Sequence, residues 1–92
     1  MKNPNLVIID LRSPRDFEKD REFYTSRNLN VLNLDFFKAP KEVEILDRQK
    51  EYLVVCESGM LSDILTKVMQ SKGFKSVKNV KGGIEELKRL LK

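Results

Sequence analysis

Short apolar runs alternate with longer amphipathic and polar stretches along this chain of 92 residues. Residues 6–9 and 52–55 are fully apolar and include β-branched side chains, a pattern typical of strands buried on both faces of a sheet. Residues 31–34 and 77–80 are apolar enough to predict two further short strands. The hydrophobic pattern thus spreads strands over the whole chain.

The first predicted helix follows the first strand directly. Ser13 can cap its start, Pro14 suits the first helical position, and Asp16 places a carboxylate three residues after the cap. These residues predict a helix over about 14–20. Residues 21–30 show no clear hydrophobic period, so we interpret them as a connection without regular structure.

The remaining segments predict further helical structure. Residues 35–50 mix apolar and charged positions and predict one or two short helical turns. A longer helix is predicted over 62–72, ended by Gly73, and a closing helix follows the turn at residues 82–83. The predicted buried faces of these two helices are Ile64, Leu65, Val68 and Met69 in the first, and Ile84, Leu87, Leu90 and Leu91 in the second.

The order of these elements predicts the fold class. Strands that alternate with helices favour right-handed crossovers and a mainly parallel sheet covered by helices on both faces. We therefore expect an α/β fold with a small central sheet of about four to five strands. A chain of this length predicts a single domain over residues 1–92.

Two features of the composition narrow the chemistry. Histidine is absent, which excludes Ser-His and Cys-His catalysis and zinc sites built on imidazole. Cys56 is the only cysteine, so the chain can form neither an internal disulfide nor a cysteine-rich metal site. We expect no metal and no organic cofactor. The lone thiol is typical of a protein in a reducing cytosol.

Charge and hydropathy add little that is specific. Lys and Arg number 18 against 14 Asp and Glu, a net charge of +4, but these charges are scattered as on an ordinary solvated surface. No basic stripe with interleaved aromatic residues predicts nucleic-acid binding. No apolar run approaches the roughly 20 residues of a membrane span. We expect a cytoplasmic protein with no membrane or nucleic-acid partner.

The candidate chemistry centres on Cys56, which follows the second apolar run. Ligands of open α/β sheets bind beyond the carboxyl ends of the strands. If residues 57–62 curl into a tight loop, their N–H groups and the following helix dipole would stabilise a thiolate and lower the thiol pKa. On position alone the alternative stays open, because a lone cysteine after valines is often a small buried hydrophobe.

Three segments resemble the rhodanese-like domain family. They are Asp10-Leu11-Arg12 after the first strand, Cys56-Glu57-Ser58-Gly59-Met60-Leu61-Ser62 after a buried strand, and Gly82-Gly83-Ile84 before the last helix. They occur in the family's order and spacing and cover nearly the whole chain. The resemblance implies that Cys56 takes a sulfane sulfur from thiosulfate or a persulfide donor, holds it as a persulfide, and passes it to a thiol or cyanide-like acceptor.

On this reading each loop position has an expected role. Cys56 is the nucleophile, and the backbone amides of residues 57–62 bind the anionic donor and the persulfide. The partners are a small anionic or persulfide sulfur donor and a thiol acceptor that could itself be a protein. Ser62 is expected to cap the following helix, with contact to substrate as the alternative role of its hydroxyl, and Gly82 and Gly83 to shape the backbone.

Departures from the family pattern qualify this expectation. Many members place Arg directly after the cysteine and again near the end of the loop, where this chain has Glu57 and Leu61, so thiosulfate should bind less well. The family's usual Gly-His-Ile-x-Gly-Ala segment is missing around residues 23–30, and Leu87 stands where Trp is frequent. A catalytically weak binding or regulatory module is the alternative function.

Two further points concern charged residues. Related phosphatases and arsenate reductases need an Arg after five intervening residues, and Ser62 occupies that position, which argues against both activities. Asp10 and Arg12 either organise the loop through hydrogen bonds or let the arginine reach an anion near the cysteine. Glu57 is interpreted as a solvent-exposed residue, with selection of a neutral or cationic partner as the alternative.

Overall fold

The computed structural model describes residues 5–92 of the chain. Ten elements follow one another along these residues. They are β1 (Leu6–Asp10), α1 (Pro14–Lys19), α2 (Arg21–Ser26), β2 (Asn30–Asn33), α3 (Ala39–Glu42), the 3-10 turn η1 (Val43–Ile45), β3 (Glu51–Val55), α4 (Met60–Ser71), β4 (Ser76–Asn79) and α5 (Gly83–Leu90).

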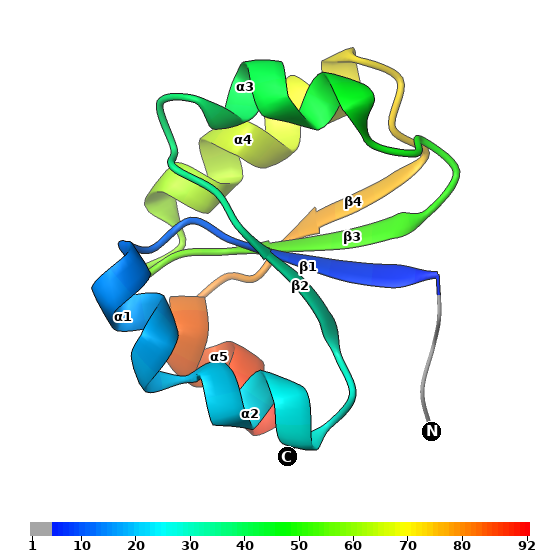
Figure 1. Cartoon of the computed structure of the whole chain (residues 1–92). Helices are drawn as coiled ribbons and strands as arrows, with labels where there is room; N and C mark the ends of the chain where they lie inside the picture. The colour runs from blue at the N-terminus through cyan, green and yellow to red at the C-terminus, as the bar shows by residue number, and fades with distance from the viewer. Residues whose placement is uncertain (1–4) are drawn as a thin grey trace.

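The four strands form one sheet in the order β2-β1-β3-β4, and every neighbouring pair is parallel. The register places Ile9 beside Val54 in the centre of the sheet. Helices α3 and α4 cover one face, while α1, α2 and α5 cover the other (Figure 1). The predicted α/β fold with helices on both faces is therefore confirmed, with four strands in the described part of the chain.

Alternate residues of the first strand feed two separate cores. Val7 and Ile9 of β1 pack toward α4 with Leu65 and Met69, whereas Ile8 packs toward α5 with Ile84. Apart from Val7, these apolar side chains are at most 1% exposed. A strand buried on both faces has no polar side to alternate with, which explains the fully apolar runs in the sequence.

The segment at residues 21–30 was wrongly predicted to lack regular structure, because it contains α2. Phe23 and Tyr24 pack edge to face, and Tyr24 stacks on Phe17 of α1 with ring centroids 5.7 Å apart. The residue before α2, Asp20, makes no capping hydrogen bond from its side chain. This short helix is therefore held by aromatic packing rather than by local signals that a sequence displays.

Helix α4 begins earlier than predicted, and two apolar positions were misplaced. Its first residue is Met60 and its cap is Gly59, so the expectation that Ser62 caps the helix is wrong. Ile64 and Leu90 are 51% and 60% exposed although both were predicted to be buried. At these two positions the apolar pattern therefore extends beyond the buried face of the helix. None of the helices within residues 5–92 is long and apolar enough to cross a membrane.

Candidate active site

The thiol of Cys56 lies directly beyond the carboxyl end of β3, where the chain turns into α4. The residue is 4% exposed and belongs to the core between the sheet and α4. Its Sγ accepts hydrogen bonds from the backbone N–H of Gly59 at 3.1 Å and from that of Ser62 at 3.4 Å. The loop and the first turn of the helix thus direct donors at sulfur, as the sequence led us to expect.

Gly59 makes this tight turn possible. Its φ of 102° lies in the left-handed region that favours glycine, and it is the residue before α4. A Cβ at this position would lie 3.3 Å from the backbone nitrogen of Gly82. Space and conformation together therefore favour glycine where the chain reverses around the sulfur atom.

Ser62 is the only loop side chain that contacts the sulfur among the described residues. It is 0% exposed, and its Oγ lies 3.3 Å from Cys56 Sγ. The same Oγ donates to Asn79 Oδ1 at 2.5 Å, and Asn79 Nδ2 donates to the Gly59 carbonyl at 3.1 Å. Asn79 was not predicted from the sequence as a site residue. The available signal was a polar residue at the carboxyl end of β4, the strand next to β3.

The surroundings of the thiol favour its ionised form. Burial raises the pKa of Cys56, but its hydrogen bonds with Ser62 and those from the amides of Gly59 and Ser58 lower it by more, so that the pKa falls below its ordinary value. The donors that achieve this come mainly from backbone groups at a helix start. No histidine is needed to lower the pKa of this thiol.

The other loop side chains lie toward the surface. Glu57 and Ser58 are exposed, and Met60 and Leu61 are 75% and 42% exposed. Leu61 lines a hollow of about 470 Å³ that continues to Phe37 and Arg12. Among the residues predicted to bind the donor, Gly59 and Ser62 are thus in hydrogen-bond contact with sulfur, while the side chains of Glu57, Met60 and Leu61 are available to a partner.

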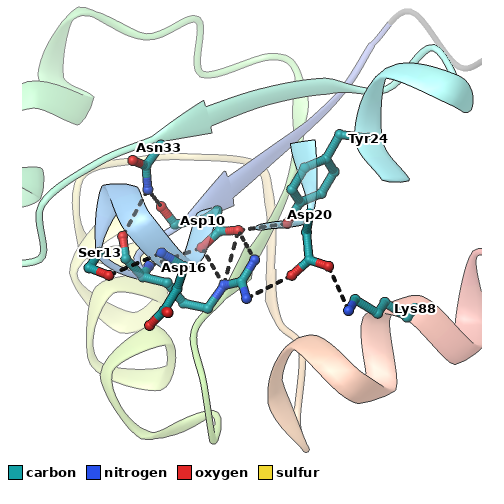
Figure 2. A network of polar contacts seen from close by, with 8 residues as sticks. Asp10, Ser13, Asp16, Asp20, Tyr24, Asn33 and Lys88 are labelled. Atoms are coloured by element: carbon teal, nitrogen blue, oxygen red, sulfur yellow. Dashed lines mark hydrogen bonds and ion pairs between the residues drawn. The ribbon is translucent and has the colours of Figure 1, made fainter. Parts of the chain in front are cut away.

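The side chain of Arg12 has a structural role, because its guanidinium is held by two carboxylates on the opposite side of the sheet end from Cys56. Its guanidinium donates to Asp10 through Nη2 at 2.9 Å and pairs with Asp20 through Nη1 at 2.9 Å. Asp10 also accepts from the Tyr24 hydroxyl at 2.7 Å, and Asp20 pairs with Lys88 of α5 at 2.6 Å (Figure 2). In the described chain Arg12 makes no hydrogen bond to residues 57–62.

This buried network joins β1 to the helices beneath it. Asp10 is 0% exposed, and Asn33 of β2 donates to the carbonyls of Asp10 and Arg12 at 3.0 and 2.9 Å (Figure 2). Burial together with the negative charge of Asp10 raises the pKa of Tyr24, which therefore remains a neutral donor. The arrangement matches a role of Asp10 and Arg12 in organising the loop rather than in binding an anion.

The turn before α5 approaches the back of the cysteine loop. Gly82 and Gly83 both have positive φ, 89° and 75°. A Cβ on Gly83 would lie 2.0 Å from the carbonyl oxygen of Glu57, closer than any real contact allows. The predicted backbone role of this glycine pair is confirmed, and its consequence is a direct connection between α5 and the residues around the thiol.

Sequence relatives point to sulfur chemistry. The chain is 34% identical over 76 residues to a tRNA sulfurtransferase of Shewanella sediminis; the match covers 83% of this chain. It spans only 15% of the relative's length, so this chain corresponds to one part of a much larger protein. The likeness therefore concerns a domain and does not extend to the reaction of the whole relative.

Solved structures and a family model agree with this relationship. The rhodanese-like domain of an Anabaena protein has a TM-score of 0.68 and 16% identity, covering 92% of each chain. A rhodanese-related protein from Thermoplasma volcanium has a TM-score of 0.66 and 25% identity, covering 88% of this chain and 74% of its own. The family model of the rhodanese-like domain matches residues 1–90, and we conclude that this chain belongs to the rhodanese-like domain family.

Proposed function

We propose that this protein is a sulfurtransferase or persulfide carrier that holds a sulfane sulfur on Cys56. The observation that carries the proposal is the pair of backbone donors at sulfur, the amides of Gly59 at 3.1 Å and of Ser62 at 3.4 Å. These donors stabilise a thiolate before reaction and would stabilise the terminal charge of a persulfide after it. The relatives named as sulfurtransferases support the same class of reaction.

The proposed reaction has two balanced steps. The Cys56 thiolate attacks the outer sulfur of thiosulfate, a new S–S bond forms at Cys56, and the S–S bond of thiosulfate breaks to release sulfite. The outer sulfur of the Cys56 persulfide is then attacked by an acceptor thiolate or by cyanide. This restores the Cys56 thiolate and releases a new persulfide or thiocyanate. No metal, organic cofactor or external oxidant is needed.

The loop composition favours donors other than thiosulfate. Glu57 places a negative charge directly after the cysteine, and Leu61 an apolar side chain near the loop end, so no side-chain cation of residues 57–62 attracts a dianion. A persulfide with less charge would meet less repulsion. We therefore propose a small-molecule or protein persulfide as donor and a thiol as acceptor. A single thiol that has no partner cysteine suits a reducing compartment such as the cytosol.

Intact mass after exposure to a sulfur donor tests this function. We expect a gain of about 32 Da, one sulfur atom, that cyanide removes and that Cys56→Ser abolishes. Thiosulfate and a glutathione persulfide are compared, and the persulfide is expected to load the protein more completely. Failure of both donors to add sulfur to the folded wild-type protein would overturn the proposal.

The second candidate is a binding module of low catalytic activity. It is favoured by exposed apolar side chains beside the cysteine loop, among them Met60 at 75% and Phe37 at 87% exposure, with Phe37 and Leu61 lining one hollow. A binding module should keep its partner in Cys56→Ser and lose it in Phe37→Ser. A sulfur carrier should lose sulfur loading in the first variant and keep it in the second.

A further inference from the structure

The hydroxyl of Ser62 has two neighbours that compete for its single proton. Cys56 Sγ lies 3.3 Å from Ser62 Oγ, and Asn79 Oδ1 lies 2.5 Å from it. An amide oxygen can only accept a hydrogen bond, so the short contact requires that the hydroxyl donate to Asn79. Ser62 therefore presents a lone pair, not a proton, to the sulfur atom.

The orientation of the Asn79 amide is fixed by its other end. Its Nδ2 donates to the carbonyl of Gly59 at 3.1 Å, which leaves Oδ1 facing Ser62. With the amide reversed, Nδ2 would face the hydroxyl and Oδ1 would face a carbonyl oxygen, two acceptors without a proton between them. Through the Gly59 carbonyl, the cysteine loop thus also fixes the orientation of the Asn79 amide, which competes with Cys56 for the hydroxyl proton of Ser62.

This arrangement favours the neutral thiol at the Ser62 contact. A lone pair directed at sulfur suits an S–H donor and opposes a thiolate, whereas the amides of Gly59 and Ser62 favour the thiolate. For the hydroxyl to assist the thiolate, its proton must turn from Asn79 to Sγ. The S–H proton then leaves to solvent, and Asn79 Oδ1 loses its donor.

Charged side chains do not dominate this cluster. The charged residues on the adjoining elements are Glu51 of β3, Asp63 and Lys67 of α4 and Lys78 of β4, and Glu57 and Lys81 follow β3 and β4. In the described chain none of them hydrogen-bonds to Cys56, Ser62 or Asn79 through its side chain; Asp63 pairs instead with Lys67. The leading influences on the thiol are burial and the hydrogen bonds named above.

We propose that Asn79 is a positioning residue that holds the hydroxyl proton of Ser62 away from Cys56 and so limits the fraction of thiol present as thiolate. Asn79 acts on sulfur only through Ser62. The value of this device for sulfur transfer rests on the function proposed above, whereas the acidity of the thiol can be measured without any sulfur donor.

A double-mutant cycle on the thiol pKa tests the proposal. The pKa of Cys56 is read from the pH dependence of thiolate ultraviolet absorbance and of the iodoacetamide reaction rate, in wild type, Asn79→Leu, Ser62→Ala and the double variant. Asn79→Leu is expected to lower the pKa and raise the alkylation rate near pH 6 by up to about tenfold, one pKa unit. Ser62→Ala removes the lone pair that opposes the thiolate, so it is expected to lower the pKa by less than Asn79→Leu does, and the double variant is expected to match Ser62→Ala.

A role of Asn79 in merely holding the loop gives a different result. Loss of the Gly59 contact would then shift the pKa equally with and without the Ser62 hydroxyl, and that outcome, or a rise in Asn79→Leu, overturns the proposal. Gln70→Leu is the matched control, because it removes another amide that joins α4 to β4, at the Val77 carbonyl, and should leave the pKa unchanged. If Asn79→Leu fails to fold, Asn79→Ala removes the same acceptor. If the four proteins give the expected pKa values but the wild-type protein takes up no sulfur, only the proposed function is overturned.

Discussion

The backbone N–H of Ile84 donates to the carbonyl oxygen of Cys56 at 3.0 Å. The first turn of α5 is thereby bonded to the residue that carries the thiol, although the thiol itself lies in the core on the opposite face of the sheet. Gly83 makes the approach possible, since any side chain there would collide with the Glu57 carbonyl. The geometry around the thiol therefore depends on a helix that contributes no side chain to the sulfur.

Gly83→Ala should destabilise the protein strongly. A Cβ 2.0 Å from the Glu57 oxygen must displace backbone, and the positive φ adds strain; together they should cost about 2–5 kcal/mol. Gly73→Ala is the matched control, since Gly73 has φ 91° but no atom within 4 Å of the place a Cβ would occupy, and should cost about 1–2 kcal/mol. Urea unfolding measures both. Equal losses in the two variants would show that the close approach of Gly83 to the Glu57 carbonyl does not add to the cost of the substitution.

Tyr24→Phe tests the buried network. The change removes the donor to Asp10 and leaves the ring stacked on Phe17, so we expect a loss of about 1–3 kcal/mol in the free energy of unfolding, because a buried carboxylate loses a partner. Tyr52→Phe removes a bond to the backbone carbonyl of Asp47 in a partly buried place and should cost about 1 kcal/mol or less. A larger loss in Tyr52→Phe would contradict this ranking.

Asp20 should make stability depend on acid pH. Burial raises the pKa of Asp20, but its bonds to Lys88 and Arg12 lower it by more, so the folded-state pKa lies below the ordinary 3.8. Its contribution is therefore complete above about pH 4 and is lost as the pH falls through the lower folded-state pKa. The difference in unfolding free energy between wild type and Asp20→Asn should be constant from about pH 5 to 7. It should shrink toward about pH 2, because Asp20 becomes protonated in the folded state as well.

Asp35→Asn serves as the control for that titration. Asp35 is exposed and forms no ion pair with the other residues between 5 and 92, so its substitution should change stability little at any pH in this range. If the Asp20→Asn difference is as large at pH 2 as at pH 6, the lowered pKa of Asp20 does not contribute to folding.

Glu57→Arg should improve the use of thiosulfate. Replacing an anion by a cation beside the thiol removes repulsion of a dianion and adds attraction, each worth about 1 kcal/mol in water at contact distance, so kcat/KM should rise by about thirtyfold. The gain should fall with added salt. Glu51→Arg makes the same charge change at the far end of β3 and should leave the rate nearly unchanged. A similar gain in both variants would assign the effect to net charge alone.

The features that the sequence predicts depend on local signals, whereas the features that it misses depend on contacts between residues far apart in the sequence. The strands and the cysteine loop follow from apolar runs and from small residues such as Ser58 and Gly59, which are local signals. Helix α2 was missed because its stability comes from packing against Phe17, which belongs to another helix. Asn79 was missed because its importance lies in two hydrogen bonds to residues that are far from it in the sequence.

The anchoring of Cys56 by β4 and α5 also fixes when the site can form during synthesis. A chain emerging from the ribosome presents the thiol before Asn79, Gly83 and Ile84 exist outside the exit tunnel. Until those residues arrive, neither the amide that orients Ser62 nor the bond to the Cys56 carbonyl is in place. The set of contacts around the thiol is therefore complete only when β4 and α5 have packed against the rest of the fold.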